Sequence, residues 1–248
     1  MRGPPATKRP LAVLVGAAIA AAGVGAPPAP AAAVAATPAV RLSDELTRTY
    51  VANPWRLAAV RRAPDPRARG VARLRWLTED GLPEVYLVLR RAIHPRFGRW
   101  LQIRVPMRPN GRTGWVRERH LGPLRLVRTR LVIDRLRLRA RLYRKGRRVW
   151  SAPVGVGKAG TPTPPGRFWI REVLRVPGSG GVYGPWAFGT SAYSRLSDWP
   201  GGGVVGIHGT NRPGLVPGRP SHGCVRVRNA ALRRLAGLMP VGTPVRIL

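Results

Sequence analysis

The sequence predicts a mainly β protein with one or two short helices, organised as two β-rich regions behind an N-terminal export segment. Short apolar alternations of the kind that strands show begin near residue 71 and recur to the C-terminus. The chain also carries 30 glycines and 27 prolines, which interrupt helices, and clear helix signals are confined to one segment near the C-terminus. We expect an export segment over 1–36, a linker or loosely folded lead-in over 37–70, a small β-barrel-like domain over 71–122 and a larger β domain over 123–248.

The first 36 residues have the pattern of a secretory signal. Basic residues precede an apolar run from Leu11 to Ala26, and small residues follow up to Ala36. We expect export to the extracytoplasmic cell envelope, with cleavage near Ala35. A retained membrane anchor is the alternative, although the apolar run is short for a spanning helix. No later segment is apolar enough to span a bilayer.

The first β region contains strand patterns and a clear turn. Val85, Leu87 and Leu89 alternate with other residues, and Pro109-Asn110-Gly111 separates two further runs as a hairpin turn does. The run 100–104 and the Gly-Trp-Val that follows the turn resemble the small bacterial barrels of Src-homology-3 type. An unrelated small β domain with aromatic core residues remains the alternative.

The second β region opens with a hairpin. Apolar residues alternate with arginines from Arg135 to Leu142, which predicts a half-buried strand with Leu136 on its apolar face, and the chain turns at 144–146 before a return strand over 149–156. We then expect strands over 168–176, 204–207 and 243–248, glycine-rich loops over 178–189 and 201–203, and a helix over 230–238 capped by Asn229.

The charge balance is strongly basic. The chain has 44 Lys and Arg against 10 Asp and Glu, a formal net charge of +34. Such a charge attracts polyanions. The arginines are spread along the whole chain without a recognition motif and accompany many Ala, Gly and Pro residues, so we expect no specific nucleic-acid binding and attribute most of the charge to a GC-rich coding bias. Anionic cell-wall polymers or an anionic membrane surface are the partners that the charge would favour. We expect a monomer.

Cys224 is the only cysteine, so an exported chain cannot use it for an internal disulfide. Two of the four histidines, His208 and His222, lie within sixteen residues of it. A free thiol has a pKa of about 8.5 and attacks carbonyls only as the thiolate, so a catalytic cysteine needs a base. His208 follows a predicted strand, and Gly223 allows close approach of a substrate. A catalytic thiol, a buried core cysteine and a zinc site remain open here, although zinc requires a further ligand.

The residues around this thiol resemble a known family. His208 lies thirteen positions before the segment Ser221-His222-Gly223-Cys224-Val225-Arg226. This pattern is similar to the signature of the YkuD-type L,D-transpeptidase catalytic domain. The similarity extends to Pro-Thr-Pro-Pro-Gly at 162–166, to Ile-His-Gly-Thr at 207–210 and to 241–245, and it covers 124–248. It implies a mixed β-sandwich catalytic domain over 123–248.

The resemblance implies a role for each matching residue. Cys224 is the nucleophile, His208 the general base, and Gly209 supplies the carbonyl that orients His208. The pocket and the oxyanion site are shaped by Ser221, His222 and Gly223. We add the inference that Arg226 contacts a substrate carboxylate, which a guanidinium matches geometrically, with a purely structural arginine as the alternative.

The implied activity is that of a cysteine acyltransferase of peptidoglycan. Cys224 attacks the carbonyl between the third residue and the terminal D-Ala of a tetrapeptide stem, D-Ala leaves, and an amine of another stem resolves the acyl-enzyme into a 3-to-3 cross-link. Acylation by carbapenems is expected, and no metal or organic cofactor is implied. An L,D-carboxypeptidase, the attachment of a wall protein through the same thioester and a noncatalytic wall-binding protein are the alternatives.

Overall fold

The computed structural model describes residues 1, 3, 37–177, 181–198 and 200–248. The described residues from 37 onward belong to one compact unit, Val34–Leu248. The predicted export segment and its cleavage site lie almost entirely outside the described residues, so both stay predictions. Within the described part of the chain, no helix has the length and apolarity needed to cross a membrane.

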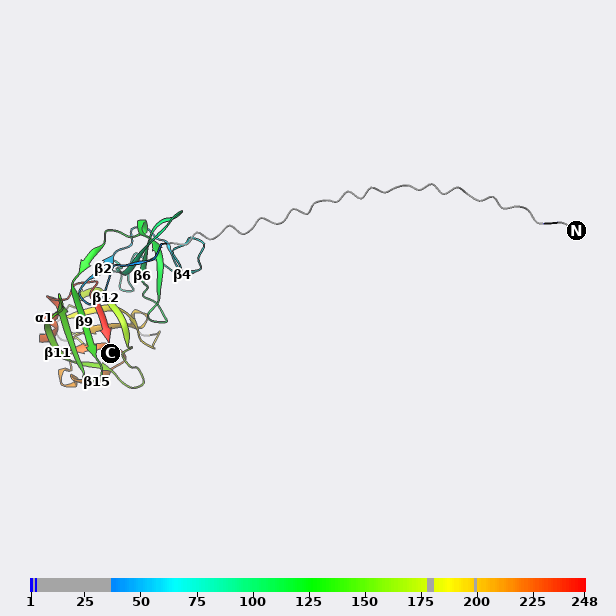
Figure 1. Ribbon diagram of the computed structural model, residues 1–248. Helices are drawn as coiled ribbons and strands as arrows, with labels where there is room; N and C mark the ends of the chain where they lie inside the picture. The colour runs from blue at the N-terminus through cyan, green and yellow to red at the C-terminus, as the bar shows by residue number, and fades with distance from the viewer. Residues whose placement is uncertain (2, 4–36, 178–180, 199) are drawn as a thin grey trace. The chain divides into compact units, whose positions relative to one another are not determined.

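The N-terminal part of this unit forms an eight-stranded sheet (Figure 1). Its strands are paired in the order β4-β3-β7-β6-β5-β2-β8, with β1 on β5. The elements are β1 (Val40–Arg41), β2 (Thr49–Ala52), β3 (Ala59–Arg61), β4 (Gly70–Arg73), β5 (Tyr86–His94), β6 (Gly98–Arg104), β7 (Thr113–Arg117), the 3-10 turn η1 (Glu118–His120) and β8 (Arg125–Val127). The predicted turn at 109–111 connects the antiparallel pair β6 and β7.

The expectation of a loosely folded lead-in over 37–70 is wrong. The strands β1, β2, β3 and the start of β4 lie in this stretch and pair within the sheet. Val51, Ala52 and Val60 are fully buried. These strands have two to four residues each, which is too short for an alternation to be visible in the sequence.

The C-terminal part forms a nine-stranded sheet in the order β10-β9-β17-β12-β13-β14-β16-β11-β15, and an additional β10–β11 pairing closes eight of its strands into a ring. The elements are β9 (Thr129–Asp134), β10 (Arg139–Arg144), β11 (Arg147–Gly157), β12 (Gly166–Arg175), β13 (Trp186–Tyr193), η2 (Pro200–Gly203), β14 (Val204–His208), η3 (Pro213–Leu215), β15 (Gly218–Ser221), β16 (Val225–Val227), α1 (Asn229–Ala236) and β17 (Pro244–Ile247). The mainly β class with short helices is confirmed.

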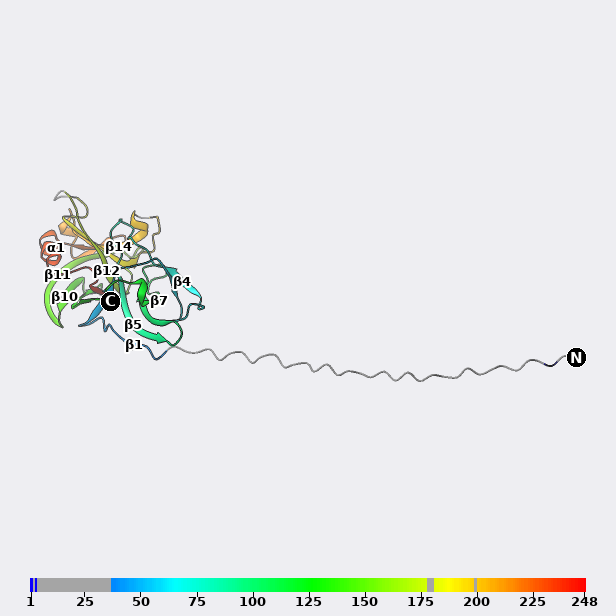
Figure 2. The same ribbon diagram turned by 90° about the horizontal axis from the view of Figure 1, so that it is seen from above.

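The core of this ring explains which strands form. Leu131, Ile133, Phe188 and Ile207 are at most 1% exposed and pack in one cluster. The helix α1 lies beside β11 (Figure 2), and the Trp150 indole N–H donates to the Ala231 carbonyl over 3.0 Å. Burial of one face of each strand is the dominant stabilisation of such a sheet.

Three local predictions for this region need correction. Residues 135–138 form the turn between β9 and β10 because the Asp134 side chain accepts the Arg137 N–H at 2.9 Å, and Leu136 is therefore 83% exposed. Residues 186–189, expected in a glycine-rich loop, begin β13. The helix α1 has no side-chain cap, and Asn229 binds elsewhere.

The strand β12 contacts the N-terminal sheet through its side chains. The Trp169 indole N–H donates to the Val85 carbonyl over 2.8 Å. The fully buried Arg171 guanidinium pairs with Glu84, and with Glu79 at 2.7 Å. Breaking a buried pair by removing one partner is strongly destabilising. These bonds fix the segment 77–85 beside β12.

Candidate active site

The strand β14 brings His208 and Cys224 together. It runs parallel to β16, with Ile207 opposite Val225 and His208 opposite Arg226. Cys224, the residue before β16, therefore lies beside Gly206, whose backbone N–H donates to the Cys224 Sγ over 3.4 Å. Residues separated by eighteen positions thus meet because two short parallel strands pair.

Gly206 is the common neighbour of the thiol and the imidazole. A Cβ placed on it would lie 3.7 Å from His208 Cδ2 and 3.8 Å from Cys224 Sγ. Both groups therefore border the same small space. Sequence reasoning missed Gly206, since a glycine inside a predicted strand gave no sign of what it faces.

The His208 ring has a defined proton. Its Nδ1 lies 2.7 Å from the Gly209 carbonyl, which only accepts, so Nδ1 carries the hydrogen and Nε2 has the lone pair. Tyr183 packs edge-on against the ring at 4.9 Å between centroids. The imidazole is thus oriented by the Gly209 carbonyl, which the family resemblance implied, and by the Tyr183 ring, which the sequence did not predict.

Gly209 is held from three sides. Its N–H donates to the Tyr183 carbonyl over 2.7 Å. A Cβ at this position would overlap the Asn229 Oδ1 and lie 2.8 Å from the Gly184 Cα. The Asn229 Oδ1 accepts the Thr210 N–H at 2.9 Å instead of capping α1. Only glycine fits here, and the carbonyl that orients His208 is therefore fixed.

Burial keeps both reactive groups neutral at rest. It lowers the pKa of His208 from 6.5 to about 4, with a smaller contribution from the charge of Arg226 and an opposing one from the Gly209 carbonyl. Burial also raises the pKa of the Cys224 thiol, against the opposing effects of the Gly206 N–H and Arg226. The resting state is a thiol beside a neutral imidazole, which can accept the thiol proton.

The loop before Cys224 is tightly bonded. The Ser221 Oγ donates to the Cys224 carbonyl over 2.6 Å and accepts the Gly223 N–H at 3.2 Å. Gly223 has a φ of 127°, a conformation that favours glycine. The Thr163 hydroxyl donates to the Gly223 carbonyl over 2.8 Å, so the proline-rich segment supports this loop. The Gly223 N–H, predicted to face an oxyanion, is engaged by Ser221.

Two predicted site residues lie beside this centre. His222 is half-buried and does not belong to the lining of the cavity described below. Arg226 is half-buried, and its Nε is buried without a hydrogen-bond partner among the described residues. Its charge acts on the pKa of both Cys224 and His208.

A cavity of about 320 Å³ opens next to the thiol. Its wall follows one face of three neighbouring strands, because alternate residues of a strand share a face. Those lining residues are Leu174 of β12 and Val176 just after it, Ala187 and Gly189 of β13, and Val204, Gly206 and His208 of β14; Phe188 of β13 also borders the cavity. The lining also includes three residues with polar or reactive side chains, namely Cys224, Tyr183 and Asp80. Among the described residues, no group of three or more His, Cys, Asp or Glu side chains is arranged to hold a metal ion.

The C-terminal part of the chain is similar to known proteins. Residues 128–247 match the family model of the YkuD L,D-transpeptidase catalytic domain. These residues belong to the YkuD family. The resemblance inferred from the sequence is confirmed over this part of the chain.

Relatives of the YkuD domain are found in several bacteria. YkuD of Bacillus licheniformis, assigned as an L,D-transpeptidase, is 38% identical over 107 residues, 43% of this chain and 58% of that protein. ErfK/SrfK of Salmonella typhimurium, also assigned as an L,D-transpeptidase, is 32% identical over 141 residues, 49% of this chain and 45% of that protein. The chain thus spans roughly half the length of the curated relatives that it matches.

Solved structures that are similar to this chain cover about half of it. An Enterococcus faecium L,D-transpeptidase has 23% identity and a TM-score of 0.38, over 48% of this chain and 49% of that chain. The Bdellovibrio bacteriovorus protein Bd1075 has 26% identity and a TM-score of 0.39, over 49% of this chain and 48% of that chain.

Proposed function

We propose that this protein is a peptidoglycan L,D-transpeptidase of the bacterial cell envelope that forms 3-to-3 cross-links through a Cys224 acyl-enzyme. One observation carries the proposal. In a YkuD domain, the thiol of Cys224 and an imidazole with a free Nε2 lone pair border the same glycine at the wall of a cavity.

The first half-reaction forms a thioester. The His208 Nε2 takes the Sγ proton of Cys224, and the thiolate attacks the carbonyl between the third residue and the terminal D-Ala of a tetrapeptide stem. The tetrahedral intermediate collapses with cleavage of the C–N bond, and the proton on Nε2 passes to the leaving amine of D-Ala. The Gly206 N–H, already directed at Sγ, stabilises the negative charge on sulfur.

The second half-reaction reverses these roles. An amine of a second stem attacks the thioester carbonyl, its proton passes to His208, and the C–S bond breaks. The thiolate then recovers its proton from His208. Gly209 keeps the imidazole oriented through both steps. Ser221 holds the loop of His222 and Gly223 beside the thiol through its bonds to the Cys224 carbonyl and the Gly223 N–H. We further propose that Arg226, whose charge acts on both Cys224 and His208, contacts a substrate carboxylate.

Intact-protein mass spectrometry tests this proposal. The full chain is incubated with a tetrapeptide stem, alone and with an acceptor stem, beside Cys224→Ala and His208→Ala. We expect an adduct equal to the stem minus D-Ala on the wild-type protein, no adduct on Cys224→Ala, and a cross-linked dimer when the acceptor is present.

Other outcomes identify the alternatives. An adduct that resolves only to free tripeptide, with or without acceptor, indicates an L,D-carboxypeptidase. A Cys224→Ala protein that still forms a covalent carbapenem adduct contradicts the assignment of the nucleophile. If no adduct forms although Cys224 can be alkylated, a noncatalytic wall-binding protein is the better description.

A further inference from the structure

Two neighbouring carboxyl groups, Asp80 in the wall of the cavity and Glu172 buried behind that wall, form no ion pair within 4.0 Å in the described part of the chain. Glu172 of β12 is 2% exposed, its Oε2 accepts a hydrogen bond from the Thr78 hydroxyl, and its buried Oε1 has no hydrogen-bond partner among the described residues. Asp80 lines the cavity close enough to act on Glu172. Burial, followed by smaller effects that include the charge of Asp80, raises the pKa of Glu172 to about 7.

The contrast with the neighbouring acids is sharp. Glu79 and Glu84 are both paired with Arg75 and Arg171. No ion pair within 4.0 Å includes Asp80 or Glu172 in the described part of the chain, although the protein holds 44 Lys and Arg. A buried carboxyl that has one oxygen without a donor and no paired cation is unfavourable, so these two acids point to a cation that arrives with a ligand.

Glu172 and the thiol lie over two paired glycines of the cavity wall, Gly189 and Gly206, which we call the floor. Glu172 is paired with Gly189, and Gly189 is paired with Gly206. The Glu172 Oε1 lies 2.0 Å from where a Cβ of Gly189 would be, and the Cys224 Sγ lies 3.8 Å from where a Cβ of Gly206 would be. Because directly opposed Cβ positions are about 4.5–5.5 Å apart, the carboxyl oxygen and the sulfur are separated by roughly 11 Å or less.

A bulge in β12 gives Glu172 this position. The register shifts between Ile170 and Glu172, so Arg171 is the extra residue of the strand. Arg171 is bonded to Glu84 and Glu79, whereas Glu172 lies over Gly189. Further along the same face, Leu174 and Val176 present apolar surface to the cavity.

We propose that Asp80 and Glu172 bind the side-chain ammonium of the substrate residue whose carbonyl is transferred to Cys224. This inference rests on the proposed function. An aliphatic amine side chain reaches about 6 Å from its Cα, given bonds near 1.5 Å, so it spans from a carbonyl on the sulfur to the carboxyls. Leu174, Val176 and Ala187 contact its methylene groups.

The attacking amine of the second stem does not fit this place. It must approach the thioester carbon to about 3–3.5 Å before the bond forms, and it must be unprotonated. An ammonium held at the carboxyls is too far from the sulfur and keeps its proton. The carboxyl pair therefore selects the donor stem and takes no part in bond formation.

The N-terminal sheet thereby contributes to the substrate site. Asp80 belongs to the segment between β4 and β5, which the buried Arg171 fixes through Glu84 and Glu79. Thr78 of the same segment donates to Glu172. Residues 37–122 thus have a function in substrate selection that the YkuD domain alone does not supply.

The test compares two donor stems that differ in one group. One tetrapeptide has a free side-chain amine on its third residue, and the other is acetylated at that amine. For the full wild-type chain we expect the kcat/KM of acylation to be about 10- to 100-fold higher with the free amine, the size expected of a hydrogen-bonded charge pair. The variants are Asp80→Asn, which changes an exposed residue, and Glu172→Gln.

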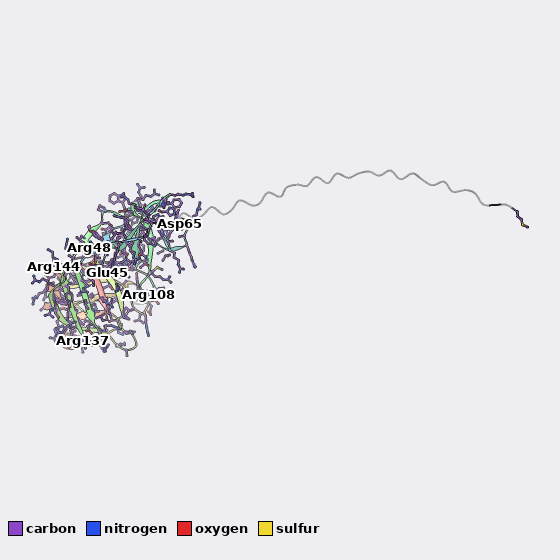
Figure 3. The ribbon with its side chains drawn as sticks, in the orientation of Figure 1. Glu45, Arg48, Asp65, Arg108, Arg137 and Arg144 are labelled. Carbon is purple, nitrogen blue, oxygen red and sulfur yellow. The ribbon has the colours of Figure 1, made fainter. Side chains whose placement is uncertain are left out.

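Asp65→Asn is the matched control. It makes the same change of charge in the turn between β3 and β4 (Figure 3), and Asp65 does not line the cavity. We expect Asp80→Asn to lower acylation by the free-amine stem at least 5-fold and to leave the acetylated stem unchanged, while Asp65→Asn retains the wild-type preference. Equal losses for both stems, no loss, or a loss confined to the acceptor-dependent step would overturn the proposal.

Binding to Cys224→Ala separates this proposal from the proposed function. Calorimetry with the free-amine and the acetylated tripeptide stems requires no acylation. Preference for the free amine that disappears in Cys224→Ala/Asp80→Asn supports the ammonium site even if wild-type protein forms no adduct. Acylation of both stems at equal rates leaves the proposed function standing and rejects the ammonium site.

Discussion

The two ends of the cavity differ in charge and in how the chain builds them. At the thiol end, Cys224 and His208 are neutral at rest and are held by backbone groups and glycines. At the acid end, Asp80 and Glu172 lie close together and form no ion pair within 4.0 Å in the described part of the chain. In our proposals, the thiol end performs proton transfer and the acid end recognises a positive charge. Loss of a group at the first end should slow chemistry with every substrate, and loss at the second should slow it only with a cationic substrate.

The largest effect that separates the two ends is expected from His208→Ala. Without a base for the thiol proton, the rate of Cys224 acylation should fall about 100- to 10,000-fold, and equally with the free-amine and the acetylated stems. Single-turnover mass spectrometry measures this rate. His222→Ala is the comparison, because His222 does not line the cavity, and we expect a loss of about 10-fold or less. A larger loss of rate with His222→Ala than with His208→Ala would show that His222, and not His208, is the base.

The thiol end of the cavity was predictable from the sequence, whereas the acid end was not. The thiol end lies within seventeen consecutive residues, 208–224, and its catalytic pattern is local. The residues alone pointed only to some backbone carbonyl as the partner of His208, because no carboxylate is close in sequence, and the family resemblance singled out Gly209. The structure has the Gly209 carbonyl 2.7 Å from the His208 Nδ1. The fold class was predicted from strand alternation for the same reason, namely that burial of one face is a local signal.

The acid end could not be predicted because it joins distant segments. Thr78 and Glu172 are separated by 94 positions, and a bulge in β12 decides which way Glu172 faces. Asp80 follows Glu79 directly, yet only the latter pairs with Arg171. Alternation gives no information on partners from another sheet. The short strands β1 to β4 were missed for a related reason, since their burial depends on β5 and β7.

A second prediction uses pH to distinguish the ends. His208 has a pKa of about 4, so its Nε2 becomes protonated and stops acting as a base only as the pH falls toward 4. The kcat/KM of acylation should therefore fall near pH 4 and not near the ordinary histidine pKa of 6.5. The acetylated stem must be used, because Glu172 has a pKa of about 7 and affects a cationic stem at higher pH. An acid limb near 6.5 with the acetylated stem would show that His208 is not buried in the active protein.

The same pKa of His208 gives a direction for stability. The unfolded chain binds the His208 proton near 6.5 and the folded chain near 4, so the unfolded state holds more protons between these values. The contribution of His208 to the free energy of unfolding is therefore complete above about pH 6.5 and declines as the pH falls toward 4. Urea unfolding of wild-type protein and His208→Gln across this range measures it, and the two curves should converge in slope below pH 4.

The smallest effect is expected from a single methyl group on either floor glycine. In Gly206→Ala the methyl would lie 3.7–3.8 Å from His208 and Cys224, an ordinary contact, so folding should be retained while acylation of both stems falls about 10-fold. In Gly189→Ala the methyl would overlap Glu172, whose side chain must move. That variant should lose its preference for the free-amine stem and some stability, which urea midpoints measure. If Gly189→Ala keeps the preference, Glu172 does not lie over the floor; if Gly206→Ala loses it, the two ends of the cavity are not separate sites.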